Sequence, residues 1–248
     1  MSSILSRILK LPSDHVAISN PKKEVRLASI VAMIMLAATC LMECFRYTVY
    51  RPLLQLDKRP PFAMDHFDVL FTGFFYAVLL LPLWIAMKKS GQTRESLGVS
   101  KRNLRQMFAF GLLLSGVYFS GAAFFAQDFG GNFEAFSGSL LYGLVVYAIV
   151  GFGEEVVWRG YIQTRFVAYS GTVKGVLITS FLFALLHFPL RYYQHAGVAS
   201  EALASTLLVF PAGLLFGYVM LKTQNVIPCT IFHLFGNWSA LFWGIPPF

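Results

Sequence analysis

The stretch Gly153-Glu154-Glu155-Val156-Val157-Trp158-Arg159 decides how this chain folds. It places two adjacent carboxylates and an arginine between the apolar run 140–152 and the pair Tyr161-Ile162. A charged side chain at the centre of a bilayer costs about 2.5–3.5 kcal/mol on insertion scales. Charges inside such segments therefore usually face a cavity and mark a functional site. The stretch predicts a polar site buried among membrane helices.

The composition indicates a membrane protein. Of 248 residues, 56% are hydrophobic and only 13% are charged, with 25 Phe, whereas soluble domains carry about 25% charged residues. The net charge of +8 would suit a nucleic-acid binder, but the basic residues lie between apolar segments, as in membrane loops. We therefore expect no nucleic-acid partner. The three cysteines lie in apolar segments without a CxxC pair, so neither disulfides nor a thiolate metal site is expected.

The apolar segments predict an all-α, polytopic membrane helix bundle with a buried polar cavity. Seven segments are close to the roughly 20 residues that cross a bilayer. They cover 27–47, 67–87, 106–127, 136–158, 172–189, 203–221 and 226–244. We expect a tail (1–26), N-terminal helices with a basic loop (27–104) and a catalytic core (105–248).

The connections carry helix breakers. Pro52, Pro60 and Pro61 are expected to break any helix in the linker 48–66. Gly130-Gly131-Asn132 predicts a turn. The tail contains a short amphipathic stretch, Ile4 to Leu11, that would lie on the membrane surface.

The loop charges predict the orientation. With this arrangement of spans, 15 Lys and Arg fall on the side of the N-terminus and 5 on the other. Basic loops face the cytoplasm, so the N-terminus is expected to be cytoplasmic.

Six ionisable or strongly polar side chains in or next to the last four spans are candidates for the site. They are Glu154, Glu155, Arg159, His187, His233 and Asn237. Glu155 and Arg159 are four residues apart, so they share a helix face and can form an ion pair. Glu154 is turned by about 100° from Glu155, so it can face elsewhere.

These side chains suit the hydrolysis of a peptide bond. Such a reaction needs a base that activates water and donors that hold the oxyanion. Glu154 can be the base, and His187 can position the water or protonate the leaving amine. His233 and Asn237 can donate to the oxyanion. Alternatively, Glu154, His187 and His233 could bind a divalent metal such as zinc.

Three motifs in this order resemble a known family. Glu-Glu-x-x-x-Arg at 154–159, Phe-x-x-x-His at 183–187 and His-x-x-x-Asn at 233–237 are similar to the motifs of the CPBP intramembrane proteases. This family, also called the CAAX-protease and bacteriocin-processing (Abi) family, includes the type II CAAX prenyl endopeptidases. The segment 210–213, Gly217-Tyr218 and Thr223 also resemble its penultimate helix, and the resemblance covers about 105–244.

The resemblance implies a role for each matching residue. Glu154 would activate water and His187 would share that water, whereas His233 and Asn237 would form the oxyanion site. Glu155 and Arg159 would complete the first motif as a structural pair, with Phe183 one turn before His187.

The resemblance also implies a substrate class and a location. The substrate would be a protein or peptide, lipidated or membrane-anchored, such as a prenylated CAAX tail, a bacteriocin precursor or a C-terminal sorting tag. The membrane would be a bacterial inner membrane. We expect no cofactor, and a divalent metal such as zinc is the alternative.

The predicted boundaries conflict with these roles. A fourth span over 136–158 puts Glu154 near the cytoplasmic end, whereas His187 lies near the outer end of the fifth span. A longer fourth helix, over about 138–168, would bring Glu154 to mid-depth.

Other interpretations remain open from the sequence. The chain could be a membrane immunity or scaffold protein that binds a peptide without cleaving it, or a proton-coupled carrier, although no repeat supports a carrier. Outside the motifs, Arg165 is expected to snorkel to the surface. Glu43 and Arg46 are expected to form an interfacial anchor, and His195 a solvated loop residue.

Overall fold

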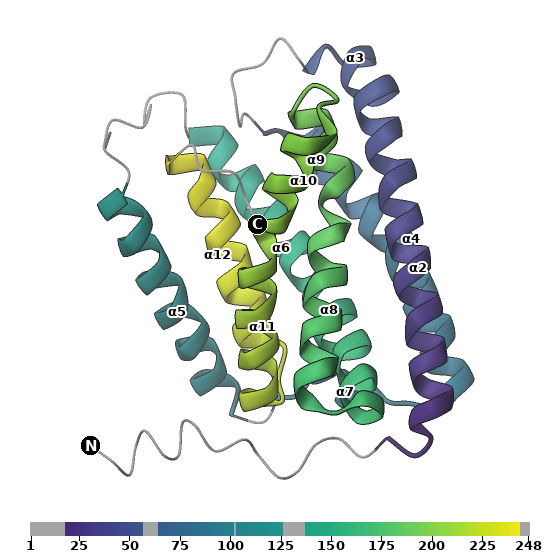
Figure 1. Cartoon of the computed structure of the whole chain (residues 1–248). Helices are drawn as coiled ribbons and strands as arrows, with labels where there is room; N and C mark the ends of the chain where they lie inside the picture. The colour runs from purple at the N-terminus through teal and green to yellow at the C-terminus, as the bar shows by residue number, and fades with distance from the viewer. Residues whose placement is uncertain (1–17, 57–63, 102, 126–136, 244–248) are drawn as a thin grey trace.

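The protein is a bundle of helices in the computed structural model, which describes residues 18–56, 64–101, 103–125 and 137–243 (Figure 1). These residues contain no β-strand, so the predicted all-α fold is confirmed. The expectations for Ile4 to Leu11, for Pro60 and Pro61 and for the Gly130 turn lie outside the described residues.

The described residues form seven helical columns, and several columns are built from more than one helical segment. In chain order they are α2 (Pro21–Phe45) with the π-helix η1 (Arg46–Tyr50) and α3 (Arg51–Leu53); α4 (His66–Ser90); α5 (Leu104–Phe125); α6 (Ser137–Glu155) with the π-helix η5 (Val156–Gln163) and α7 (Thr164–Ser170); α8 (Thr172–Leu186) with α9 (Phe188–Gln194); α10 (Ala199–Leu207) with α11 (Val209–Thr223); and α12 (Ile227–Trp243). A short 3-10 turn, η3 (Arg94–Leu97), follows α4.

The columns have the length and surface of membrane helices. Five are long and apolar enough to cross a bilayer, and α5 and α12 run beside them. Large apolar side chains point outward, including Leu41, Leu70, Phe74, Val117 and Phe124. An outward apolar surface of this kind is stable only when lipid covers it. The chain is therefore an integral membrane protein.

Local sequence explains where the first columns begin. Asn20 caps α2, because its side chain accepts a hydrogen bond from the Lys23 backbone N–H at 3.1 Å, and Pro21 suits the first helical position. Asp65 and Asp68 form a reciprocal capping box at the start of α4.

The helix break expected at Pro52 is wrong. The first column continues through η1 into α3, and Pro52 occupies the first turn of that short helix. A proline inside a helix removes one backbone hydrogen bond, which can kink the helix without ending it. The π-helical segment before it changes the bonding pattern at the point where the break was expected.

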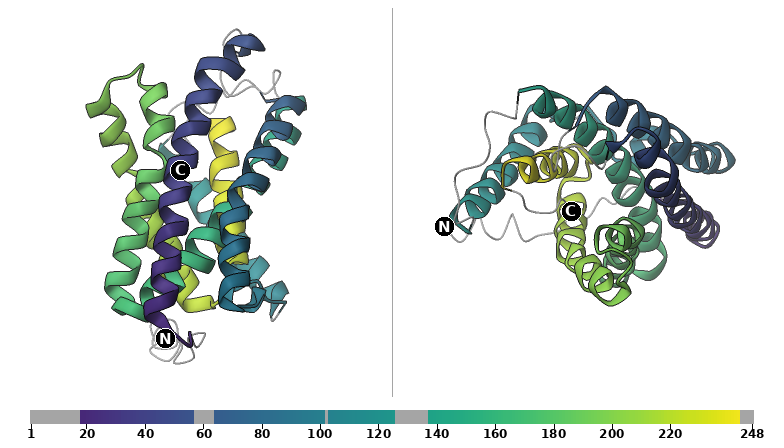
Figure 2. Two further views of the ribbon diagram at one scale, coloured as in Figure 1. Left: turned by 90° about the vertical axis from the view of Figure 1, so that its right-hand side faces the viewer. Right: turned by 90° about the horizontal axis from the view of Figure 1, so that it is seen from above.

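Side-by-side packing of the columns leaves α12 in the interior. It contacts α5 on one side and α6 on the other, as the view from above shows (Figure 2). In the same way α4 packs between α6 and α2, and α8 packs against α7 and α11. The carboxylates of the fourth column are thus enclosed by several helices, which shields them from lipid.

The fourth column resolves the conflict in depth. It continues to Ser170, so the boundary at residue 158 is wrong and the longer-helix alternative is confirmed. Gly171, with a φ of 85°, then turns the chain directly into α8. Glu154 precedes Gly171 by 17 residues and His187 follows it by 16. Two arms of nearly equal length in a helical hairpin place these side chains at a similar depth.

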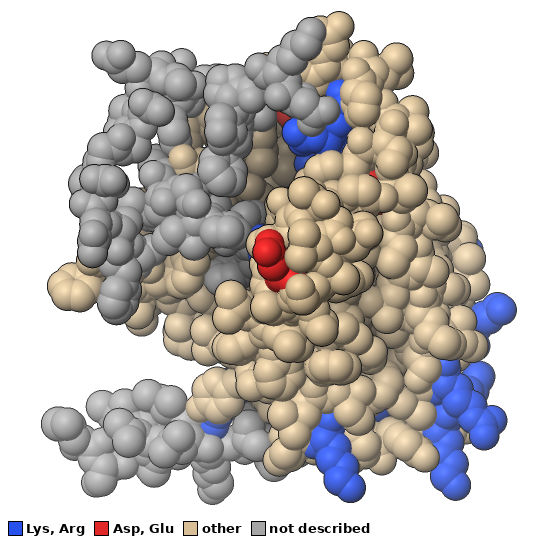
Figure 3. Space-filling model, turned by 45° about the horizontal axis from the view of Figure 1, so that its top comes forward, with Lys and Arg blue, Asp and Glu red and all other residues tan. Residues whose placement is uncertain are grey.

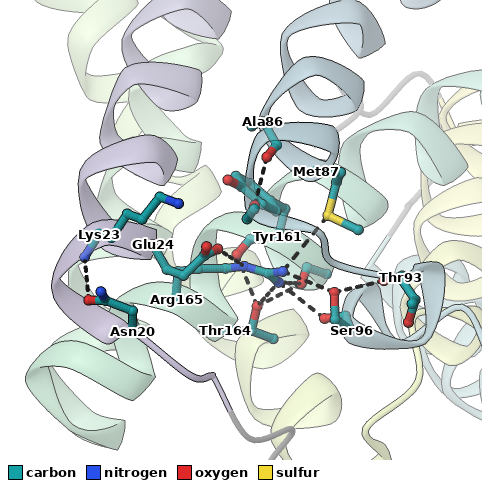
Figure 4. Close-up of polar contacts among 12 residues, drawn as sticks. Asn20, Lys23, Glu24, Ala86, Met87, Thr93, Ser96, Tyr161, Thr164 and Arg165 are labelled. Atoms are coloured by element: carbon teal, nitrogen blue, oxygen red, sulfur yellow. Dashed lines mark hydrogen bonds and ion pairs between the residues drawn. The ribbon is translucent and has the colours of Figure 1, made fainter.

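Arg165 is fully buried, so the expectation that it snorkels is wrong. Its guanidinium donates to the Ser96 carbonyl at 3.1 Å and to the Ser96 and Thr164 hydroxyls at 3.0 and 2.8 Å. Glu24 Oε2 lies 3.6 Å from its Nε, and its Cζ lies 4.3 Å from the Tyr161 ring centroid (Figure 4). Arg165 therefore ties the start of α2 and the turn after α4 to α7, which explains why it stays inside.

Candidate active site

A cavity of about 360 Å³ lies among the first, second, fourth, fifth and last columns. At mid-depth it is lined by Glu154, His187 and Asn237, which were predicted from three separate motifs. It extends along α2 and α4 to the end of the bundle where α3 ends and α9 lies. The fold therefore brings residues that are 33 to 83 positions apart around one space.

Of the two adjacent carboxylates of the fourth column, Glu154 is the one that faces this cavity. Its Oε1 accepts a hydrogen bond from the Tyr76 hydroxyl of α4 at 2.5 Å. Its Oε2 is buried and lies 4.0 Å from His233 Nε2. A carboxylate that is held on one oxygen while the other lies close to an imidazole is well placed to take a proton.

Glycine 153 makes the contact with α4 possible. A Cβ at this position would overlap the Tyr76 ring at its Cδ1 atom. Without a side chain at Gly153, the Tyr76 ring lies flush on the fourth column and its hydroxyl reaches the neighbouring Glu154.

Glu155 is buried away from the cavity, as its helical position predicted. Its Oε2 lies 3.5 Å from Arg159 Nε, which confirms the expected pair one turn apart. Its Oε1 accepts a hydrogen bond from His233 Nδ1 at 2.9 Å. Arg159 in turn stacks over the rings of Phe183 and Phe216, with its Cζ 4.0 and 5.1 Å from their centroids. These five side chains form an enclosed cluster that connects the fourth, fifth, sixth and seventh columns.

His187 lies where α8 gives way to α9. Its Nδ1 is 2.9 Å from the Phe183 carbonyl oxygen. A carbonyl can only accept, so Nδ1 carries the proton and Nε2 keeps a lone pair in the neutral ring. The Phe183 ring stands at 69° to the imidazole with centroids 5.0 Å apart, which fixes the ring plane. His187 can therefore accept a hydrogen bond from water beside Glu154.

His233 and Asn237 lie one turn apart on α12 but occupy different environments. Asn237 lines the cavity. His233 is fully buried, stacked on Phe216 at 5.2 Å and 18°. Its Nδ1 donates to Glu155, so its Nε2 is the nitrogen turned toward Glu154. The geometry thus gives Asn237 access to a bound peptide and places His233 between the two carboxylates.

The described side chains do not fit a metal site. Within residues 18–56, 64–101, 103–125 and 137–243, no three His, Cys, Asp or Glu side chains converge as metal ligands. In particular, Glu154, His187 and His233 do not form such a group. Hydrolysis without a metal stays a prediction.

Three residues of the cavity were missed or misjudged from sequence. Tyr76 carried no signal, since a tyrosine in an apolar helix is common. Glu43 and Arg46 were assigned to the interface, yet Glu43 is buried and both line the cavity. Their charges inside a long apolar run were the signal that could have indicated a functional site. His195 lies 3.3 Å from the exposed carboxylate of Glu201, outside the cavity.

Comparison with known proteins gives one family. Residues 136–239 match the family model described as type II CAAX prenyl endopeptidase Rce1-like. No curated protein and no solved structure matches the chain significantly. The matched region contains all three motifs, whereas α2, α4 and α5 lie before it.

Proposed function

We propose that this chain, whose residues 136–239 match the Rce1-like family of type II CAAX prenyl endopeptidases, is a membrane protease. In this proposal Glu154 activates the water that hydrolyses a peptide bond near the C-terminus of the substrate. The observation that carries the proposal is the shared cavity. Glu154, His187 and Asn237 come from three columns and line the same space.

The proposed reaction needs only side chains of this chain. Glu154 takes a proton from water while the neutral His187 accepts the other hydrogen bond of that water. The resulting hydroxide adds to the carbonyl carbon, and the Asn237 amide donates to the oxyanion. Glu154 then gives its proton to the leaving nitrogen as the C–N bond breaks. The products are a new carboxylate and a free amine.

His233 and Glu155 act as positioning residues in this proposal. Glu155 fixes the His233 ring through Nδ1, which turns Nε2 toward Glu154. Arg159 pairs with Glu155 and packs over the Phe183 ring, and these contacts hold Glu155 in place. The oxyanion role assigned to His233 from the motif is therefore secondary to that of Asn237.

The charges of the bundle support a cytoplasmic N-terminus. Basic side chains gather where α2 begins and α4 and α11 end; they are Lys22, Lys23, Arg26, Lys88, Lys89 and Lys222. Figure 3 shows Lys and Arg atoms along this lower end. A basic rim of this kind faces the cytoplasm. The cavity then extends toward the opposite, outer face, which favours substrate tails that have already crossed the membrane.

The proposed function is tested by mapping protein C-termini. Membrane and secreted proteins from cells with the wild-type chain are compared with those from cells without it. We expect a set of shortened C-termini that require the chain. We also expect the purified protein to keep its activity after treatment with a strong chelator, because the described residues form no metal site. An unchanged set of C-termini would favour a peptide-binding scaffold, and loss of activity that zinc restores would favour a metalloprotease.

Tyr76 is expected to raise the turnover rate by holding Glu154. Replacing Tyr76 with Phe keeps the ring against Gly153 and removes only the donor to Glu154 Oε1. Hydrogen bonds to charged groups contribute about 1.5–3 kcal/mol, so kcat should fall about 10- to 100-fold. KM should change little, because the hydroxyl is already bound to the carboxylate. The measurement is steady-state kinetics in detergent.

A matched control is Tyr118→Phe on α5. Tyr118 packs edge-on against Phe232, outside the cavity. Its variant should keep the wild-type kcat. An equal fall in kcat in both variants would mean that the Tyr76 hydroxyl acts only through protein stability.

A further inference from the structure

We infer that the pocket between the start of α2, α7 and α8 binds the phosphate headgroup of an anionic phospholipid. This pocket has a volume of about 420 Å³ and shares no lining residue with the cavity of Glu154. Its basic lining residues are Lys22 and Arg26 of α2, and the described residues that line it include no Asp or Glu. A pocket lined by one sign of charge attracts a ligand of the opposite sign.

Two helix faces build the pocket. The α2 residues that line it recur every three or four positions, so they share one helix face; they are Lys22, Val25, Arg26 and Ser29. The opposite wall has the same spacing on α7 and one residue of α8; these residues are Phe166, Tyr169, Ser170 and Ile178. Helix α2 packs against both α7 and α8, at the lower end of the bundle in Figure 1. The pocket is therefore part of the packed bundle.

The two cations of the pocket are available to a ligand. Lys22 and Arg26 are exposed, and neither forms an ion pair with another described residue. The acidic residue of the same helical turn, Glu24, is buried on another side of α2. Its Oε2 lies 3.6 Å from Arg165 Nε (Figure 4). Because Glu24 is paired inside the bundle, it does not neutralise the pocket.

The spacing of the two cations suits a single phosphate. Residues four positions apart lie one helical turn apart, with their Cβ atoms about 5–6 Å from each other. An ammonium and a guanidinium at this spacing can donate to two oxygens of one phosphate. The serine hydroxyls donate within their own helices, Ser29 to the Val25 carbonyl at 2.9 Å and Ser170 to the Phe166 carbonyl at 2.7 Å. Binding of the phosphate therefore depends on the two basic side chains.

The pocket extends from the basic end of the bundle to its apolar surface. From Lys22 to Ser29 the helix rises about 10 Å. The same face of α2 continues with Ile30 and Met33, which are exposed, as is Ile178 in the opposite wall. A phospholipid matches both parts, with its phosphate at the cations and its acyl chains on the apolar surface. A free phosphate matches only the first part, and basic pockets between membrane helices bind anionic headgroups.

A phospholipid in this pocket would stabilise the contact of α2 with the hairpin of α7 and α8. The two columns that form this hairpin carry Glu154 and His187. A ligand that binds only the folded state increases its stability by mass action. We therefore expect the lipid to raise the melting temperature, whether or not the chain cleaves peptides.

The test is native mass spectrometry of the full chain in detergent, titrated with dioleoylphosphatidylglycerol or dioleoylphosphatidylcholine. The two lipids have the same acyl chains, and only the first carries a net negative charge. We expect the wild type to bind one phosphatidylglycerol more tightly than any phosphatidylcholine. The double variant Lys22→Gln with Arg26→Gln should bind phosphatidylglycerol about 30-fold more weakly, or about five-fold per cation. Its binding of phosphatidylcholine should not change.

Matched variants separate the pocket from the general charge of this end of the bundle. Lys89→Gln with Arg94→Gln removes two charges from the end of α4 and from η3, outside the pocket, and should keep the wild-type affinity. Ser29→Phe keeps every charge but fills the pocket, so it should weaken phosphatidylglycerol binding, whereas Ser29→Ala should not. Size-exclusion chromatography checks that each variant is folded. An equal loss in the two double variants, or an unchanged affinity in Ser29→Phe, would overturn the pocket.

Soluble anions distinguish a lipid from a free phosphate. Inorganic phosphate and glycerol 3-phosphate lack acyl chains, so they should raise the melting temperature of the wild type far less than phosphatidylglycerol does at the same concentration. An equal rise with glycerol 3-phosphate would overturn the lipid and assign the pocket to a free phosphate. Glu154→Gln should keep the rise with phosphatidylglycerol, so a failure of the proposed protease and a failure of the lipid site are measured separately.

Discussion

Replacing Glu154 with Gln should abolish peptide cleavage while the protein still folds. The Gln side chain has the same shape and its Oε1 can still accept the hydrogen bond from Tyr76, but an amide cannot take a proton from water. A general base contributes about 10²- to 10⁴-fold to the rate, so kcat should fall by that factor. The measurement is kcat for one peptide substrate, with the amount of folded protein determined by size-exclusion chromatography in detergent.

The matched control for this carboxylate is Glu201→Gln. Glu201 lies on α10 and is exposed, with its Oε2 3.3 Å from His195 Nδ1. This variant should keep the wild-type rate. Full activity in Glu154→Gln would remove the base from the proposed mechanism, and the cavity would then have to be explained as a binding site.

Replacing Arg159 with Met should destabilise the bundle more than any single change in the cavity. Arg159 and Glu155 are both almost completely buried, and the change leaves the Glu155 charge without its ion-pair partner. Breaking a buried pair in this way costs about 3–5 kcal/mol. We expect a large fall in melting temperature in detergent, together with a low yield of folded protein. His233 should lose its fixed orientation at the same time, because Glu155 holds its Nδ1.

Two further variants separate charge from packing. Arg94→Met breaks an exposed pair, Arg94 Nε to Glu95 Oε1 at 3.6 Å, and should leave the melting temperature unchanged. The double variant Glu155→Gln with Arg159→Met removes the buried charge as well as its partner, so it should recover part of the lost stability. A double variant as unstable as Arg159→Met alone would show that the packing of Arg159 on Phe183 and Phe216, rather than the ion pair, stabilises the cluster.

The sequence predicted the fold class because lipid imposes a simple rule. Every backbone polar group in hydrocarbon must be satisfied within the segment, so long apolar runs have to be helices. It also separated Glu154 from Glu155, since residues one and four positions apart on a helix have fixed directions. The structure confirms this separation, because Glu155 forms an ion pair with Arg159 whereas Glu154 lines the cavity.

Boundaries were harder to predict because several helices are joined without a polar gap. The first column was predicted to end at residue 47 but continues past Pro52 to Leu53. The fourth column was predicted to end at residue 158 but continues to Ser170. Both columns contain a π-helical segment at this point, and hydropathy does not detect a change in backbone hydrogen bonding. The buried Arg165 was misjudged for a related reason, because its partners Glu24 and Ser96 come from other parts of the chain.

The sequence by itself determined that this is a helical membrane protein with three polar motifs, because apolar runs and helical spacing are local properties. Only the tertiary structure decided that the motifs of Glu154, His187 and Asn237 meet at one depth, through the tight turn at Gly171 and the interior position of α12. It also decided that Tyr76 holds Glu154 and that Arg46 shares the cavity. These contacts join residues tens of positions apart, and such distances are set by how helices pack against one another.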